Sequence, residues 1–208
     1  GISVYAPLLP GHGTSPEQLV FTKADQWLTF LKEQIKLLEE EFAEIYVVGN
    51  SLGGNMALLL SHESEKIKGV VTLGTAMSYP NQTIIKMLLP IARRVKVFQK
   101  KRYKSEFQRK LIQEEGYAYG SVPLHSVHQG GKILTQSRKK IKEVDTPILI
   151  MHTPNDPYTG SNSHNFIYDH VSSDDKEMFS VPDSYHVFII DKNAPLVNKK
   201  ILEFIKSH

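Results

Sequence analysis

The chain has 208 residues, 40% of them hydrophobic and 23% charged, a composition typical of one globular domain. Its formal net charge of +3 is too small to indicate a nucleic-acid partner, although ten Lys or Arg and a single acid lie between Lys86 and Lys110. The chain has no cysteine, which excludes disulfides, thiolate catalysis and zinc–thiolate sites and fits a cytoplasmic location. No stretch reaches the ~18 consecutive apolar residues of a membrane span.

Strand and helix patterns alternate along the first third of the chain. The apolar run at residues 2–6 predicts a strand, and the Gly- and Pro-rich loop "LLPGHGTSP" follows it. Apolar residues at helical spacing then predict a helix over residues 24–42. A strand at 45–48, a helix at 54–62 and a strand at 70–73 come next.

The alternation stops at residue 80 and resumes after residue 131. The stretch between carries charge and scattered apolar residues, and short helices with a loop-rich rim suit it best. The predicted elements that follow are a helix at 132–144, a strand at 147–151, a helix at 161–171, a strand at 177–181 and a helix at 195–206. This order predicts an α/β fold in which helices cover both faces of a mostly parallel sheet. We expect one domain over residues 1–208, with 80–131 as an insertion.

Ser51 lies where an apolar strand turns into a helix. The segment Gly49-Asn50-Ser51-Leu52-Gly53 matches the pattern G-x-S-x-G, which is weak evidence unless a strand precedes it and a helix follows it. Both are predicted here. A passive serine in a glycine-rich turn is the alternative. The context favours a hydroxyl held outward, beside the free N–H groups of a helix N-terminus.

A serine nucleophile needs a base, and the base needs an acid that orients it. The predicted strand 147–151 runs into "HTPNDPYTG", which contains Asp156, and the strand 177–181 runs into "PDSYHVFIID", which contains His186. The carboxyl ends of parallel strands meet at one edge of the sheet, and the chain order Ser, Asp, His is the one this architecture uses. We therefore predict that Ser51, Asp156 and His186 converge.

Other candidates fit less well. Asp145 precedes its strand and so belongs to the opposite edge. Asp183 lies only three residues before His186, which makes it a weaker choice of acid but a candidate for a supporting contact near the site. The pair His125 and His128 has a ligand-like spacing but no third ligand nearby in sequence, so no metal site is predicted. His62, His164 and His170 are expected on helix surfaces. His152, at the end of a strand, is expected to line the floor of the site.

These motifs together resemble the α/β-hydrolase superfamily. "GNSLGG", "NDPYTG" and "SYHVFIID" carry the general resemblance, and "YAPLLPGHGTSPEQL" is similar to a segment of bacterial carboxylesterases and monoacylglycerol lipases. The resemblance implies that Ser51 is the nucleophile, His186 the general base and acid, and Asp156 its orienting partner. It also implies that the backbone N–H of Leu52 is one oxyanion-hole donor, that His12 is structural, and that residues 80–131 form a small cap over the acyl pocket.

The same resemblance places a strand ending in a His-Gly motif before Gly1, where the second oxyanion-hole donor would lie. By the family's strand order this strand separates the predicted strand 2–6 from the predicted strand 45–48. Its absence would leave two unpaired edges inside the sheet. We therefore expect that this chain lacks the N-terminal strands of a longer protein.

The leading functional hypothesis is a serine carboxylic-ester hydrolase acting on small to medium acyl esters through an acyl-enzyme, with no cofactor and no metal. Two alternatives stay open: a monoacylglycerol lipase whose basic cap faces anionic lipid, and a non-catalytic binding module with the same fold. The expected partner is a small ester, with no nucleic acid. Contact with a membrane surface is a secondary possibility, and the substrate-binding residues and the oligomeric state are not predicted.

Overall fold

The computed structural model describes residues 1–78, 82–101, 110, 119–154, 156–160 and 162–208. The chain forms two compact units, one of residues 1–31 and 83–132 and one of residues 32–82 and 133–208. Within the described part of the chain, no helix combines the length and the apolar character needed to cross a membrane.

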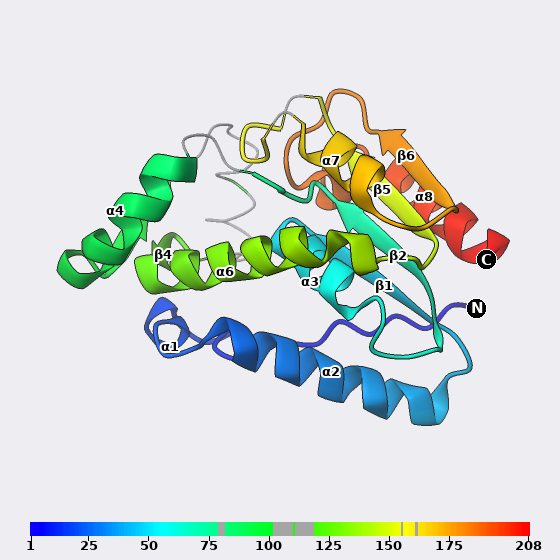
Figure 1. Cartoon of the computed structure of the whole chain (residues 1–208), viewed down its shortest axis with the longest axis horizontal. Coiled ribbons are helices and arrows are strands. Elements are labelled where there is room, and N and C mark those ends of the chain that lie inside the picture. The colour runs from blue at the N-terminus through cyan, green and yellow to red at the C-terminus, as the bar shows by residue number, and fades with distance from the viewer. Residues whose placement is uncertain (79–81, 102–109, 111–118, 155, 161) are drawn as a thin grey trace. The chain divides into compact units, whose positions relative to one another are not determined.

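The second unit is built on a four-stranded parallel sheet of order β1-β2-β5-β6 (Figure 1). Its strands are β1 (Ile45–Asn50), β2 (Ile67–Leu73), β5 (Ile148–His152) and β6 (Lys176–Ser180). The unit also contains α3 (Leu52–Leu60), α7 (Ser163–His170) and α8 (Ala194–Ser207), with short 3-10 turns at Ile141–Glu143 and Phe188–Ile190. The predicted parallel sheet is therefore confirmed, and helices α7 and α8 lie on its opposite faces.

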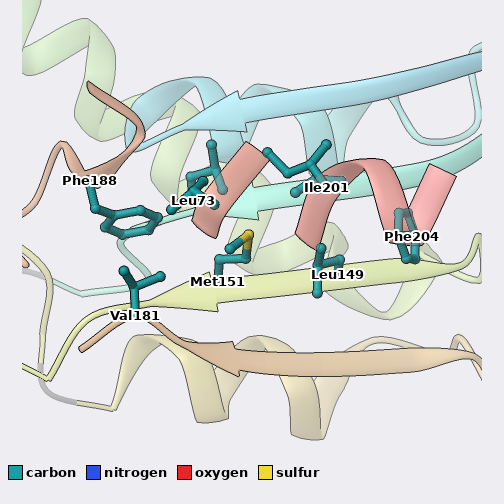
Figure 2. Packing of buried hydrophobic residues seen from close by; sticks show 9 residues of the cluster. Leu73, Leu149, Met151, Val181, Phe188, Ile201 and Phe204 are labelled. Carbon is teal, nitrogen blue, oxygen red and sulfur yellow. The ribbon is translucent and has the colours of Figure 1, made fainter. Parts of the chain in front are cut away.

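One face of this sheet carries an apolar core (Figure 2). Val71 of β2 pairs with Leu149 of β5, and side chains two residues apart in a strand share a face, so Leu73 and Leu149 point to the same side of the sheet. Both are fully buried, and Ile201 and Phe204 of α8 pack against them. Burial of this kind contributes roughly 1.5–3 kcal/mol for each large apolar side chain. The core thereby fixes the strands whose carboxyl ends carry the candidate site.

The first unit contains most of the stretch that the sequence left without a strand pattern. Its elements are α1 (Pro16–Leu19), α4 (Gln82–Val95), β3 (Phe98–Lys100) and β4 (Ser121–Pro123), with parts of α2 (Ala24–Glu41) and α6 (Leu124–Lys140). Strands β3 and β4 pair antiparallel. Parts of the predicted insertion, at 79–81, 102–109 and 111–118, lie outside the described residues, and its role as a cap stays a prediction.

Three sequence predictions were wrong in this unit. Residues 1–9 form no regular element, because a strand needs a paired neighbour and no ladder in the described ranges includes them. The helix predicted at 132–144 instead begins at Leu124, runs through Gly130 and Gly131, and ends at Lys140. The β3–β4 ladder was not predicted, since strands of three residues leave too short a pattern to detect.

Candidate active site

Ser51 occupies a strained turn between β1 and α3. Its backbone has φ 53° and ψ −116°, and positive φ is uncommon for a residue with a side chain. The Ser51 N–H donates to the Leu73 carbonyl of the neighbouring strand at 2.7 Å, which ties the turn to the sheet. The predicted strand–serine–helix arrangement is thus present, with α3 beginning at Leu52.

The close approach of strand and helix at this turn explains two of its glycines. A Cβ on Gly49 would overlap the backbone of Gly53, and one on Gly54 would overlap the Thr75 side chain. A Cβ on Gly53 would meet no atom within 4 Å. Of the two glycines in the G-x-S-x-G pattern, close packing therefore requires only Gly49, and the second crowded position is the next residue, Gly54.

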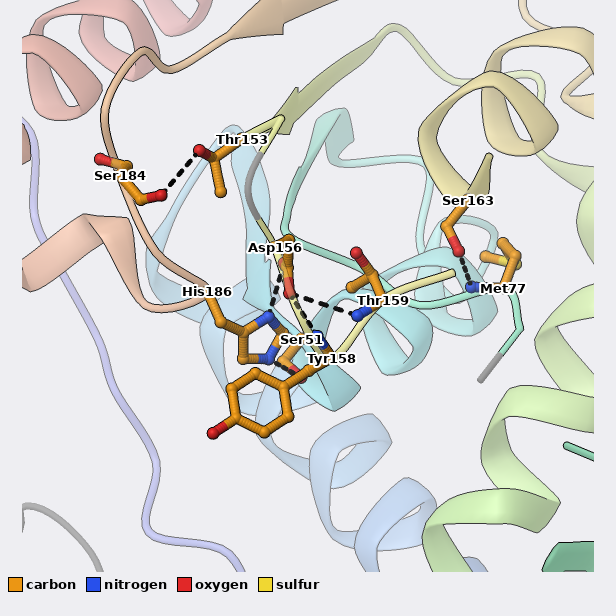
Figure 3. A network of polar contacts seen from close by, with 9 residues as sticks. All are labelled: Ser51, Met77, Thr153, Asp156, Tyr158, Thr159, Ser163, Ser184 and His186. Atoms are coloured by element: carbon orange, nitrogen blue, oxygen red, sulfur yellow. Dashed lines mark hydrogen bonds and ion pairs between the residues drawn. The ribbon is translucent and has the colours of Figure 1, made fainter. Parts of the chain in front are cut away.

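Asp156 lies in the loop after β5, where its carboxylate is held in one orientation (Figure 3). Oδ1 accepts hydrogen bonds from the backbone N–H groups of Tyr158 at 2.9 Å and Thr159 at 3.2 Å, while Oδ2 faces the His186 ring at 2.7 Å. Burial alone would raise the pKa of Asp156. The hydrogen bond and charge of His186, together with the two N–H groups, outweigh burial and hold the pKa below its ordinary value.

His186 lies between the other two predicted residues. Its Nδ1 is 2.7 Å from Asp156 Oδ2 and its Nε2 is 2.7 Å from Ser51 Oγ. An ionised Asp156 can only accept, so Nδ1 carries the proton and Nε2 is left to accept from the Ser51 hydroxyl. The structure therefore brings Ser51, Asp156 and His186 together, with His186 placed to accept the serine proton and Asp156 placed behind it.

The N-terminus of α3 adds backbone donors beside Ser51. The Leu52 N–H belongs to the first turn of this helix, where no intrahelical acceptor exists. The positive end of the helix dipole lies at the same place. An oxyanion hole needs backbone donors of this kind beside the nucleophile, and the role of Leu52 as one of them stays a prediction.

Gly74 is a site residue that the sequence analysis missed. It follows β2 with φ +54°, and a Cβ there would lie 3.3 Å from Asp156 Oδ2 and 3.2 Å from the His186 carbonyl. Its N–H donates to the Met151 carbonyl at 2.9 Å. The sequence did carry a signal for this residue, because Gly74 directly follows a buried strand at the edge where the other candidates lie.

Tyr158 lies against the candidate base. Its ring centroid is 5.2 Å from that of His186 at an interplanar angle of 50°, and the residue is 36% exposed. Figure 3 shows the phenol ring beside the imidazole. The phenol ring therefore packs at a tilt against the imidazole.

His152 and His164 stack on each other beside a small pocket that Thr75 also lines. Their ring centroids are 3.7 Å apart and their planes differ by 3°. Burial, and to a lesser extent the neighbouring His164, lowers the pKa of His152 to about 4, and burial also lowers the pKa of His164. The expectation that His164 lies on a helix surface was therefore wrong: one face of its ring is covered by His152.

The remaining candidates lie elsewhere or make other contacts. His12 Nδ1 lies 3.3 Å from the Pro10 carbonyl and its ring packs edge-on against Trp27 at 5.8 Å, which suits a structural role. Asp145 pairs with His62 at 3.4 Å. Asp183 has φ 47°, and no bond between it and His186 occurs among the described contacts.

The chain is similar to known hydrolases over nearly its whole length. The family model described as serine aminopeptidase, S33, matches residues 1–193. A carboxylesterase of Bacillus subtilis (strain 168) is 27% identical, over 99% of this chain and 82% of that protein. A thermostable monoacylglycerol lipase of Bacillus sp. (strain H-257) is also 27% identical, over 100% of this chain and 81% of the lipase.

Solved structures share the fold. A structure described with the metagenome-derived lipolytic enzymes LipS and LipT has a TM-score of 0.84 at 22% identity, over 97% of this chain and 81% of that one. The monoacylglycerol lipase of Paleococcus ferrophilus has a TM-score of 0.75 at 16% identity, over 90% of this chain and 76% of the lipase. These likenesses establish the α/β-hydrolase fold.

An added methyl group is expected to change the stability of the protein differently at Gly49 and at Gly53. Gly49→Ala should prevent folding or lower the free energy of unfolding by about 2 kcal/mol or more, because backbone atoms cannot move aside cheaply. Gly53→Ala should leave stability unchanged or raise it by up to about 1 kcal/mol, through helix propensity. Urea unfolding of both variants measures the difference, and equal destabilisation would contradict the described packing.

Acid should destabilise the protein partly through His152. The unfolded chain takes up a proton at this residue near its ordinary pKa of 6.5, whereas the folded protein resists protonation until about pH 4. The free energy of unfolding should therefore fall as the pH drops from 6.5 to 4, with no further loss from this residue below pH 4. Urea unfolding at several pH values should show a shallower fall in His152→Gln than in wild type. An unchanged slope in His152→Gln would exclude this cause.

Proposed function

Because the chain belongs to the serine aminopeptidase S33 family of α/β hydrolases, we propose that it is a serine carboxylic-ester hydrolase acting on small to medium acyl esters. The observation that most supports this is the pair of 2.7 Å contacts that His186 makes with Ser51 and Asp156. The relatives named above are a carboxylesterase and a monoacylglycerol lipase, which favours ester over peptide substrates. The cytoplasm stays the predicted location.

The proposed reaction begins with transfer of the Ser51 hydroxyl proton to His186 Nε2 as Oγ attacks the ester carbonyl. The carbonyl oxygen becomes an oxyanion, and the Leu52 N–H is proposed as one of its donors. The imidazolium that forms is stabilised by the Asp156 carboxylate. His186 then gives its proton to the leaving alcohol, and an ester bond to Ser51 remains.

The second half of the reaction repeats these steps with water. His186 Nε2 takes a proton from the water as its oxygen attacks the acyl-enzyme carbonyl. The proton then returns to Ser51 Oγ as the carboxylic acid leaves. Asp156 keeps its charge throughout, which agrees with its lowered pKa. No residue of this scheme calls for a metal or an organic cofactor.

Steady-state hydrolysis of p-nitrophenyl butyrate by the purified full-length protein tests this proposal. Ser51→Ala should abolish turnover, and Asp156→Asn should lower kcat by about 10⁴-fold because the imidazole then adopts the wrong tautomer. Asp183→Asn is the matched control, at an aspartate of the His186 loop for which the described contacts include no bond to the ring, and it should retain activity. Wild-type protein without ester hydrolysis would favour the non-catalytic binding module. Full activity of Ser51→Ala would sink the mechanism.

A second candidate function, monoacylglycerol hydrolysis at a lipid surface, is favoured by the exposed side of α4. Met87, Ile91 and Val95 recur at intervals of four residues and are 66%, 63% and 86% exposed. Basic side chains accompany them, including the exposed Arg94 and Lys96. An apolar stripe flanked by cations suits contact with an anionic lipid surface.

A paired assay separates the two functions. If α4 contacts lipid, Ile91→Glu should lower the rate on monoacylglycerol in anionic vesicles several-fold, because the new charge enters the apolar stripe. The rate on soluble p-nitrophenyl butyrate should stay the same. Leu202→Glu, at a 43% exposed leucine of α8, is the control and should affect neither rate. Equal rates on vesicles for Ile91→Glu and wild type would remove the support for the lipid-surface function.

A further inference from the structure

Thr153 contacts the loops of two candidate catalytic residues at once. It follows the last residue of β5 and is 4% exposed. Its carbonyl accepts the Asp156 N–H at 3.3 Å, which closes the turn that presents the carboxylate. Its hydroxyl donates to the Ser184 carbonyl at 3.0 Å, two residues before His186 (Figure 3).

The loop that carries His186 is closed on itself by a second set of hydrogen bonds. Ser184 Oγ donates to Asp191 Oδ2 at 2.8 Å, and the Asn193 N–H donates to Asp191 Oδ1 at 2.7 Å. The Asn193 side-chain amide donates to the Pro182 carbonyl at 2.8 Å and to Ser184 Oγ at 2.7 Å. The residues that enter and leave the loop are thus tied together, and Ser184 belongs to both sets of bonds.

The loop needs such anchors because His186 must satisfy two partners simultaneously. The ring reaches Asp156 and Ser51, each at 2.7 Å, and these partners come from two different loops. The loop contains Asp183 with a positive φ of 47° and the 44% exposed Tyr185. A shift of about 1 Å in a catalytic group can cost ~10²-fold in rate.

We propose that Thr153 and Asp191 are positioning residues that set the His186 ring against Asp156 and Ser51. The Thr153 hydroxyl fixes the distance between the two loops, and the Asp191 carboxylate fixes the shape of the His186 loop. Neither side chain contacts the reacting atoms. This inference rests on the proposed function for its kinetic consequence, and its geometric consequence is independent of that function.

Thr153→Val removes the hydroxyl while keeping the shape of the side chain, and Thr153→Ser keeps the hydroxyl. For hydrolysis of p-nitrophenyl butyrate, Thr153→Val should lower kcat by roughly 10–100-fold. KM should change by less than about twofold, since binding of the ester does not involve the loop tie. Thr153→Ser should recover most of kcat. A merely stabilising role would lower the thermal midpoint and leave kcat of the folded protein unchanged.

A proton NMR measurement tests the geometry without any substrate. The Nδ1 proton shared between His186 and Asp156 should give a low-field signal in wild type that is absent in His186→Gln. Thr153→Val should shift or broaden this signal, and Thr153→Ser should keep it. If Thr153→Val does not fold, Asp191→Asn provides the same test, because it weakens the tie within the loop and should shift the same signal.

The outcomes separate the two proposals. Wild-type protein that hydrolyses esters, with kcat and the low-field signal unchanged in Thr153→Val and Asp191→Asn, would overturn the positioning role alone. Wild-type protein without hydrolysis, but with a signal that responds to Thr153→Val, would overturn the proposed function and support the positioning role. The double variant should lose less activity than the product of the two single losses, because both residues act on one loop.

Discussion

The His186 imidazole has two hydrogen-bond partners that arrive from different strands, and the proposed chemistry depends on keeping both at 2.7 Å. Asp156 fixes the tautomer by accepting at Nδ1, and this leaves Nε2 free to take the serine proton. The arrangement needs the carboxyl ends of β1, β5 and β6 at one edge, which a parallel sheet provides. The buried core on Leu73 and Leu149 serves the site by fixing that edge.

Close packing at this edge explains why small residues gather there. Gly49 and Gly54 let α3 start directly beside β1, and Gly74 lets the Asp156 carboxylate approach the sheet. The surrounding bonds help to hold Ser51 in its strained conformation, and the bond from its N–H to the Leu73 carbonyl is one of them. The strained backbone of Ser51 and the glycines around it thus follow from one requirement, that the Ser51 hydroxyl project beyond the ends of the strands.

Much of the fold and the site could be predicted from the sequence because the signals are local. Strand β5 is a short apolar run, β6 is a short run of mixed polarity, and a proline follows each of them within two residues. Ser51, Asp156 and His186 each lie a few residues after a predicted strand. The failures have physical causes. The run at residues 2–6 has strand propensity, but no described strand pairs with it.

Other features depend on contacts between residues far apart in sequence. The importance of Thr153 comes from a bond to Ser184, 31 residues away, and that of Gly74 from the atoms opposite it. The stacking of His164 on His152 likewise joins a helix to a strand end. No pattern along the chain reports such contacts, because residue type alone does not tell which buried threonine or glycine has a partner.

Covalent labelling with a fluorophosphonate probe, followed by peptide mass spectrometry of the full-length protein, tests the central claim most directly. The probe reacts with a serine whose proton is taken by a neighbouring base. The account predicts one modified residue, Ser51, with labelling at least ~10²-fold slower in His186→Gln. An unmodified Ser51, or equally fast labelling in His186→Gln, would contradict it.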